Sequence, residues 1–333
     1  MRILYIDNRK YGHNADLHID FISYMSKKKY HRVIGLGKYL HKYLPEAILP
    51  NHRMISAHLD QVMAKYKPDL ILTYNCNGSS YEIGQDNINL YRWISKYLSK
   101  VQIPKFHVTT DYCRSGFRQS QADWFSEIGY SASFFRHKVA LDHPIGVDKY
   151  WLPFSIDKKL YLKNINKDVT SKSNNVGFLG AAHNSSQKLY ENRISAIDGL
   201  MKRDMLEITN VLDKKFTRKM LFGDNYVKFW TKNLFGLTCG GTCNFMTAKY
   251  FQIPAAYSML VCTDTNGIEL LPKDTYITYS KGKIKKLISD LDYHIKNKDI
   301  TRDKIDTLHN YVVKSHDHHT RILEMTEVFK KYV

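Results

Sequence analysis

The sequence lacks a long uninterrupted apolar stretch. None of its apolar runs approaches the roughly 18 residues that a membrane-spanning helix needs. The chain also goes straight into a strand-like segment, RILYID at residues 2–7, without the layout of a signal peptide. We therefore expect no membrane span and a cytoplasmic location.

Cysteine is scarce: the chain has five, at positions 76, 113, 239, 243 and 262. Cys239 and Cys243 form the only close pair, and no second pair or nearby histidine completes a zinc site. The histidines of the segment SHDHHT (His316, His318 and His319) are more typical of a polar loop or helix end, because neighbouring side chains on a helix point in different directions. The sequence predicts free thiols and no metal.

Acidic residues are in short supply relative to basic ones. The chain has 32 Asp and Glu against 50 Lys and Arg, which gives a net charge of +18. Residues 1–150 hold 21 basic and 13 acidic residues and residues 151–333 hold 29 and 19, so the two halves carry +8 and +10. This excess favours a polyanionic partner, whether nucleic acid, an anionic membrane surface or an anionic polymer. A lysine-rich solvated surface would give the same composition.

The residues that are present indicate two α/β halves. A chain of 333 residues with 43% hydrophobic residues can build two domains of roughly 150 residues each. Segments with helical periodicity lie between the strands, among them a basic segment at 27–43 and another at 54–65. Strand, polar loop and helix in repetition predict a parallel sheet with helices on both faces. The predicted strands are 2–8, 70–74, 105–111, 176–179, 234–239 and 275–279.

The most informative stretch is 244–264. It predicts a helix that runs up to Pro254–Ala256 and a short strand, Met259–Cys262, that ends on Thr263 and Asp264. Ligands of doubly wound sheets lie at the carboxyl ends of such strands. We therefore expect the polar residues of the helix to border a cleft: Asn244, Thr247, Lys249 and Gln252.

This stretch resembles the donor-side motif of GT-B glycosyltransferases, in particular the CgeB-like, spore-protein-like group. The usual form there is Arg-x-Phe-Glu-x-x-Ala, a glycine turn and an apolar strand ending in Asp. The matching residues here are Lys249, Phe251, Gln252, Ala255 and Asp264. The resemblance implies two Rossmann-like doubly wound parallel-sheet domains facing a cleft. It also implies transfer of a sugar from a nucleotide-sugar such as a UDP-sugar, with no further cofactor and without a metal.

The resemblance also implies a domain layout. Residues 1–157 are expected to form the acceptor-side domain, 158–174 a polar linker and 175–315 the nucleotide-sugar-binding domain. Residues 301–333 have the composition of a long helical region, and residues 316–333 are expected to cross back to the first domain.

Several residues are candidates for donor binding. Gly180 follows the first strand of the second half, and Gly240, Gly241 and Thr242 follow a later one; glycine lets the backbone approach a phosphate closely. The resemblance implies that basic side chains offset the charge of the leaving phosphates, and the candidates are Lys249 with Arg193 in support.

Two further candidates depart from the pattern of the group. Asn244 and Gln252 stand where many retaining members have a pair of glutamates. An amide can accept one hydrogen bond and donate another, so Gln252 can still meet a ribose. The alternative is a degenerate donor site that only binds.

The acceptor side depends on the first half. Asp111 ends the segment 105–111 and is the candidate base for the acceptor hydroxyl, with His13 as the alternative. A turn or N-cap role for Asp111 and a structural role for His13 compete with this interpretation.

The basic balance favours double-stranded DNA with a hydroxymethylated base, flipped out of the stack, as the acceptor in a bacterial or phage-infected cell. The alternatives are a cell-surface or spore polysaccharide precursor, and a non-catalytic nucleic-acid-binding protein on a degenerate scaffold. The sequence predicts no oligomeric state.

Overall fold

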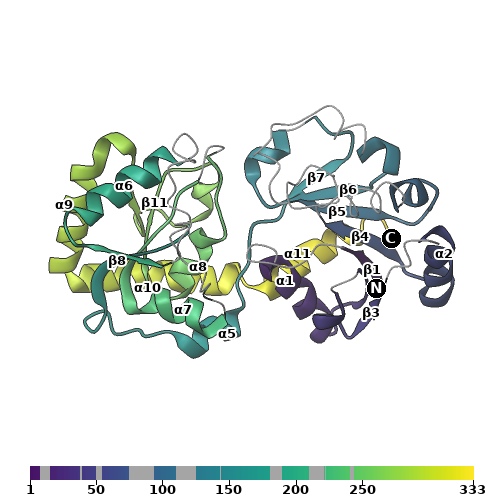
Figure 1. Cartoon of the computed structure of the whole chain (residues 1–333), viewed down its shortest axis with the longest axis horizontal. Coiled ribbons are helices and arrows are strands. Elements are labelled where there is room, and N and C mark those ends of the chain that lie inside the picture. The colour runs from purple at the N-terminus through teal and green to yellow at the C-terminus, as the bar shows by residue number, and fades with distance from the viewer. Residues whose placement is uncertain are drawn as a thin grey trace, which may run out of the picture. The chain divides into compact units, whose positions relative to one another are not determined.

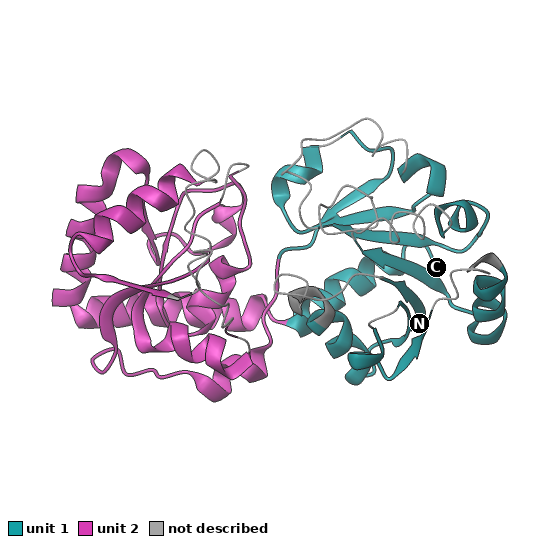
Figure 2. Ribbon diagram, viewed as in Figure 1, with its two compact units in different colours: residues 1–153, 318–333 teal, residues 154–317 magenta. Residues whose placement is uncertain are grey.

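The computed structural model describes residues 1–7, 16–37, 40–49, 55–74, 94–109, 125–142, 144–180, 190–209, 221, 223–240 and 244–333. These residues form two compact units (Figure 2). Unit 1 contains Met1–Pro153 and His318–Val333, and unit 2 contains Phe154–Asp317.

Unit 1 is built on a parallel sheet of seven strands in the order β3-β2-β1-β4-β5-β6-β7 (Figure 1). The strands are β1 (Arg2–Ile6), β2 (Arg32–Leu36), β3 (Glu46–Ile48), β4 (Leu70–Tyr74), β5 (Lys105–Thr109), β6 (Ala132–Phe135) and β7 (Asp148–Trp151). The chain order reverses between β1 and β4, which is the arrangement of a doubly wound sheet.

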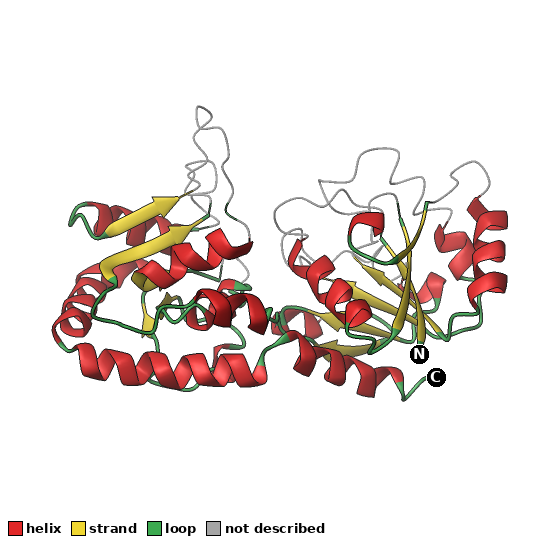
Figure 3. Ribbon diagram, turned by 90° about the horizontal axis from the view of Figure 1, so that it is seen from below, coloured by secondary structure: helices red, strands yellow, loops and turns green. Residues whose placement is uncertain are grey.

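Helices cover both faces of this sheet (Figure 3). Side chains of β1 alternate between the faces, as a strand requires. Ile3 and Tyr5 pack with helices α1 (Asp16–Lys27) and α11 (His318–Phe329). Leu4 and Ile6 pack on the other face with α2 (Ile55–Tyr66).

Unit 2 has a parallel sheet of five strands in the order β12-β11-β10-β8-β9. The strands are β8 (Ser173–Leu179), β9 (Leu206–Thr209), β10 (Asn233–Leu237), β11 (Met259–Cys262) and β12 (Ile277–Thr278). Its helices are α5 (Lys158–Asn164), α6 (Glu191–Met201), α7 (Gly223–Lys232), α8 (Lys249–Ala255), α9 (Ile284–Lys296) and α10 (Lys298–Ser315).

The two faces of this second sheet are filled by different helices. Leu260 and Cys262 of β11 belong to a core that includes residues of α7, α8 and α10. Met259 and Val261 belong to a core with residues of α6 and α9. Both units therefore have the predicted fold class, an α/β sheet with helices on both faces.

The stretch 244–264 folds as predicted. Helix α8 ends at Ala255 and strand β11 spans Met259–Cys262. Tyr257 turns the chain between them with a φ of 60°, and the Ser258 hydroxyl donates to the backbone oxygens of Trp230 (2.6 Å) and Asn233 (2.9 Å). The turn that the sequence pattern expects from glycine is thus made by a buried tyrosine.

Three expectations differ from the structure. The expected basic helix at 27–43 is wrong, because α1 ends at Lys27 and β2 occupies Arg32–Leu36. The expected linker at 158–174 contains α5, which Asp157 caps by accepting from the backbone nitrogens of Lys159 (3.0 Å) and Leu160 (3.3 Å). The helical region expected at 301–333 is interrupted, since α10 ends at Ser315 and α11 begins at His318, close to the boundary between residues 315 and 316 in the expected domain layout.

Among the described residues no helix is long and apolar enough to cross a membrane. The described residues also contain no group of three or more His, Cys, Asp or Glu side chains that could hold a metal ion. Cys239 and Cys262 are buried free thiols, as expected, and the other three cysteines lie outside the described residues. His316 caps the end of α10 and His318 begins α11, so the expected helix end is found, although both side chains are buried, with 1% and 4% exposed.

Candidate functional site

The switch point of the unit 2 sheet lies between β8 and β10. These neighbouring strands are followed in the chain by helices on opposite faces, so their carboxyl ends leave an opening at the sheet edge. Gly180 directly follows β8, and Thr238, Cys239 and Gly240 follow β10. Three of the candidate donor residues, Gly180, Arg193 and Lys249, lie together near this edge.

Gly180 lets the amino group of Lys249 approach the backbone. A Cβ at this position would lie 3.5 Å from Lys249 Nζ and 3.2 Å from the Phe178 ring. The φ of Gly180 is 154°, which L-residues rarely adopt. The glycine is therefore required by its backbone conformation and by the close Phe178 ring, and it lies next to the Lys249 amino group.

We expect Gly180→Ala to weaken the binding of a nucleoside diphosphate by about tenfold, which corresponds to about 1.4 kcal/mol. The added methyl strains the backbone, which has a φ of 154°, and crowds the Phe178 ring next to the Lys249 amino group. Calorimetric titration measures the effect, with Gly282→Ala as control because a Cβ there meets open space. Equal affinities of the two variants would contradict a role for Gly180.

Lys249 is the first residue of α8 and is partly buried. Burial and, to a smaller extent, the Arg193 guanidinium lower the pKa of its amino group to about 8, while the nearby Cys239 acts in the opposite direction. Among the described residues the amino group has no hydrogen-bond or ion-pair partner. Lys249 is thus a cation held next to another cation, an arrangement that a bound anion would relieve.

Arg193 is fixed within unit 2 by its neighbours. It lies in the first turn of α6 and is 8% exposed. Its Nε donates to Cys239 Sγ at 3.2 Å, and its guanidinium carbon lies 3.9 Å from the centre of the Tyr190 ring. Cys239 and Tyr190, neither of which the sequence analysis assigned to the site, therefore orient this charge. A tyrosine three residues before a helical arginine is a signal that could have indicated such stacking.

The side chain of Gln252 is positioned by a hydrogen bond from Tyr226. The Tyr226 hydroxyl donates to Gln252 Oε1 at 2.7 Å, and Gln252 is 5% exposed. The amide oxygen that the sequence analysis offered to a ribose thus already accepts a hydrogen bond from α7. The proposed contact with ribose would use the amide nitrogen or the second lone pair of the amide oxygen.

Thr247, Asn244 and Gly240 lie in the connection between β10 and α8. Thr247 Oγ1 lies 3.4 Å from Thr238 Oγ1, and the exposed Asn244 has a φ of 48° and accepts from the backbone of Asn266 at 2.8 Å. Gly240 is needed for packing, because a Cβ there would lie 2.3 Å from Thr265 Cγ2.

Four candidate residues cannot be placed. Gly241, Thr242, Asp111 and His13 lie outside the described residues. The structure thus brings together Gly180, Arg193 and Lys249. It adds Cys239 and Tyr190, which position Arg193, and Tyr226, which positions Gln252.

Comparison with known proteins shows which solved structures have the same fold as this chain. No family model matches the chain, and no curated protein matches it. Among solved structures, an α-glucosyltransferase in complex with UDP and a 13-mer DNA containing a central A:G mismatch has a TM-score of 0.68 and 10% identity, over 99% of this chain and 100% of that chain.

Two further solved structures match over nearly the whole chain. Sucrose-phosphate synthase from Thermosynechococcus elongatus has a TM-score of 0.64 and 9% identity, over 99% of this chain and 98% of that chain. The Anabaena protein HepE in complex with UDP-glucose has a TM-score of 0.63 and 12% identity, over 99% and 100%. The predicted fold class is confirmed: the chain has two Rossmann-like units and shares its fold with GT-B glycosyltransferases.

Proposed function

We propose that the protein is a glycosyltransferase that takes its sugar from a nucleoside-diphosphate donor. The observation that carries this proposal is the convergence of Lys249, Gly180 and Arg193 at the switch point of unit 2. Lys249 and Arg193 are both positively charged and do not neutralise each other, whereas a bound diphosphate would bring negative charge to both. Several proteins of the same fold are described in complex with UDP or UDP-glucose, so a UDP-sugar is the first donor to test.

In the proposed reaction, negative charge develops on the leaving diphosphate at this site. An acceptor hydroxyl oxygen bonds to the anomeric carbon of the sugar while the bond from that carbon to the diphosphate oxygen breaks. The leaving diphosphate takes the electron pair, and Lys249 and Arg193 stabilise the added negative charge. The acceptor proton passes to a base, for which Asp111, or alternatively His13, remains our proposal.

For the acceptor we propose double-stranded DNA with a hydroxymethylated base. The support is the net charge of +18, spread over both halves of the sequence, and the DNA present with an α-glucosyltransferase of the same fold. A polysaccharide precursor at a membrane is the second candidate, because unit 2 carries a basic and apolar face that is described below.

A thermal-shift panel tests the proposed function. UDP, GDP, ADP and CMP and their sugars are each added with and without a short duplex that carries hydroxymethylated bases. A nucleotide that binds the folded protein raises its melting temperature by mass action. A shift with one nucleotide identifies the donor base, and an additional shift with the duplex supports DNA as acceptor. No shift with any nucleotide would contradict the donor site.

The low pKa of Lys249 predicts a pH dependence of donor binding. In the free protein the amino group loses its proton above about pH 8, whereas a bound diphosphate favours the protonated form. We expect the Kd for the diphosphate to rise about tenfold between about pH 7 and about pH 9. Lys249→Arg is the control, because its guanidinium stays charged and its Kd should remain constant.

Unfolding of the protein at high pH would not explain a rise of the Kd for the diphosphate. A lysine with a lowered pKa in the folded state binds fewer protons there than in the unfolded chain between about pH 8 and its ordinary pKa of 10.5. Lys249 therefore makes the folded state more stable as the pH rises through this window. A Kd that is equally pH-dependent in the wild type and in Lys249→Arg would contradict the role of Lys249.

A further inference from the structure

A cavity of about 440 Å³ opens on unit 2 between the end of α6 and helix α9. These two helices contact each other on the same face of the sheet (Figure 1). Arg203, Lys285, Tyr293 and Lys296 are among its eight lining residues. None of the donor-site residues lines it, so this groove is a separate feature of unit 2.

The groove carries positive charge that the fold leaves unneutralised. Arg203, Lys285 and Lys296 are exposed and form no ion pair with any described residue, and Asp292 is the one acidic residue in the lining. Neighbouring lysines differ: Lys281 pairs with Glu191 at 3.2 Å, and Lys286 pairs with Asp290 at 2.6 Å. The groove lining therefore carries three cations and one carboxylate, and none of its three cations forms an ion pair with a described residue.

Exposed apolar side chains occur in the lining of the groove or within three residues of it along the chain. Met201 is 58% exposed two residues before Arg203, Tyr293 is 50% exposed within the lining, and Ile300 is 42% exposed at the start of α10. They are three of the four exposed large hydrophobic residues among the described part of unit 2; the fourth is Leu162 on α5. Apolar exposure therefore concentrates where the basic groove lies.

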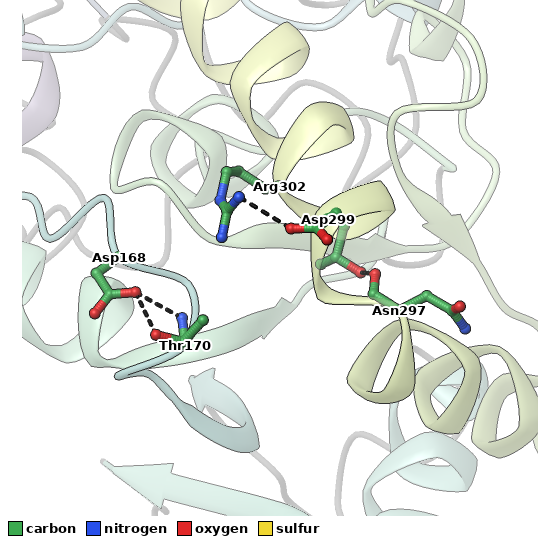
Figure 4. A network of polar contacts seen from close by, with 6 residues as sticks. Asp168, Thr170, Asn297, Asp299 and Arg302 are labelled. Atoms are coloured by element: carbon green, nitrogen blue, oxygen red, sulfur yellow. Dashed lines mark hydrogen bonds and ion pairs between the residues drawn. The ribbon is translucent and has the colours of Figure 1, made fainter.

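The corner between α9 and α10 holds this surface in place. Asn297 Nδ2 donates to the backbone oxygen of Tyr293 at 2.7 Å, and Thr301 Oγ1 donates to that of His294 at 2.8 Å. Asp299 pairs with Arg302 at 3.0 Å within the first turn of α10 (Figure 4). The nearest acid of α10 is thus engaged with its own helix and does not neutralise the groove.

We infer that this face of unit 2 docks on the surface of an anionic lipid bilayer. Arg203, Lys285 and Lys296 would bind phosphate headgroups, while Met201 and Tyr293 would enter the interfacial layer. Lysines mixed with exposed apolar side chains are typical of a lipid interface. A duplex, in contrast, would present phosphates alone to Met201 and Ile300. The inference does not depend on the proposed donor site.

Co-sedimentation of the full chain with lipid vesicles tests this inference. We expect binding to vesicles of phosphatidylglycerol and phosphatidylcholine in equal parts, weakening as salt rises, and none to pure phosphatidylcholine. Lys285→Glu with Lys296→Glu should weaken the binding at least about tenfold. Lys158→Glu with Lys159→Glu on α5 changes the net charge equally and should retain it.

Several outcomes would overturn the inference. One is an equal loss of vesicle binding in both double variants, and another is equal binding of the wild type to the two kinds of vesicle. A third is that the protein binds a short DNA duplex but no vesicles, and that Lys285→Glu with Lys296→Glu abolishes this DNA binding. A single Tyr293→Ser substitution should weaken vesicle binding without changing the response to salt; no effect would also argue against a lipid interface. The thermal shift with nucleotide should be unchanged in every variant, which separates this test from that of the donor site.

Discussion

Replacement of Lys249 by alanine is expected to lower kcat/KM for the nucleotide-sugar about a thousandfold, or about 4 kcal/mol of transition-state stabilisation. The amino group lies against Gly180, has no other partner among the described residues and would meet the charge that develops on the leaving diphosphate. Steady-state kinetics with the donor identified by the thermal-shift panel measure the effect. Binding of the diphosphate product should weaken as well.

The controls for Lys249→Ala separate chemistry from folding. Lys228→Ala removes an exposed lysine from α7 and should leave kcat/KM unchanged. The melting temperature of Lys249→Ala should not fall, because its side chain makes no hydrogen bond or ion pair with described residues. Lys249→Arg keeps the charge and should retain part of the activity. Normal turnover in Lys249→Ala would remove this residue from the phosphate site.

Replacement of Trp230 by alanine is expected to destabilise unit 2 by about 3–5 kcal/mol. Trp230 is fully buried on α7, and its ring packs edge-on against Phe229 and Tyr226 with centres 5.2 and 5.9 Å apart. The cavity also removes the support of Tyr226, which holds Gln252. Donor binding should therefore weaken in the protein that remains folded.

Urea denaturation measures the change in the free energy of unfolding. Leu162→Ala is the matched control, because this side chain in the same unit is 44% exposed and its truncation should cost less than about 0.5 kcal/mol. A midpoint for Trp230→Ala equal to that of the control would contradict the described core of α7, α8 and β11.

Strands with an apolar run and a polar end could be predicted from the sequence. Met259–Cys262 is four buried residues after a helix that ends in a turn, and nothing in its surroundings competes with that pattern. The strand Arg32–Leu36 was instead predicted as part of a helix, because a lysine-rich segment precedes it. Its Gly35 has no space for a Cβ, which would lie 2.7 Å from Leu44 Cδ1, and only tertiary packing reveals this.

The end of the chain shows a second limit. Residues 301–333 have helical composition throughout, and only the family resemblance placed a boundary between residues 315 and 316. In the structure the backbone nitrogen of Ile156 donates to the backbone oxygen of His316 at 3.0 Å, between the end of α10 and the start of α11. Helical periodicity carries no signal for a contact with a residue so far away in the sequence.

For the site, the glycine after a predicted strand indicated Gly180, and the family resemblance indicated Arg193 and Lys249. Their convergence depends on the strand order of unit 2, which places β8 beside β10. The roles of Cys239 and Tyr226 were missed, since a buried thiol and a helical tyrosine carry no sequence signal for the groups that they contact.

The central claim is a diphosphate site at the carboxyl ends of β8 and β10. Calorimetric titration of the wild type and of Lys249→Ala with UDP, GDP and ADP, each against its own nucleoside, tests it most directly. We expect at least one diphosphate to bind about a hundredfold more tightly than its nucleoside, and Lys249→Ala to remove most of that difference. Equal affinities for every diphosphate and its nucleoside, or a preference that survives in Lys249→Ala, would contradict the account.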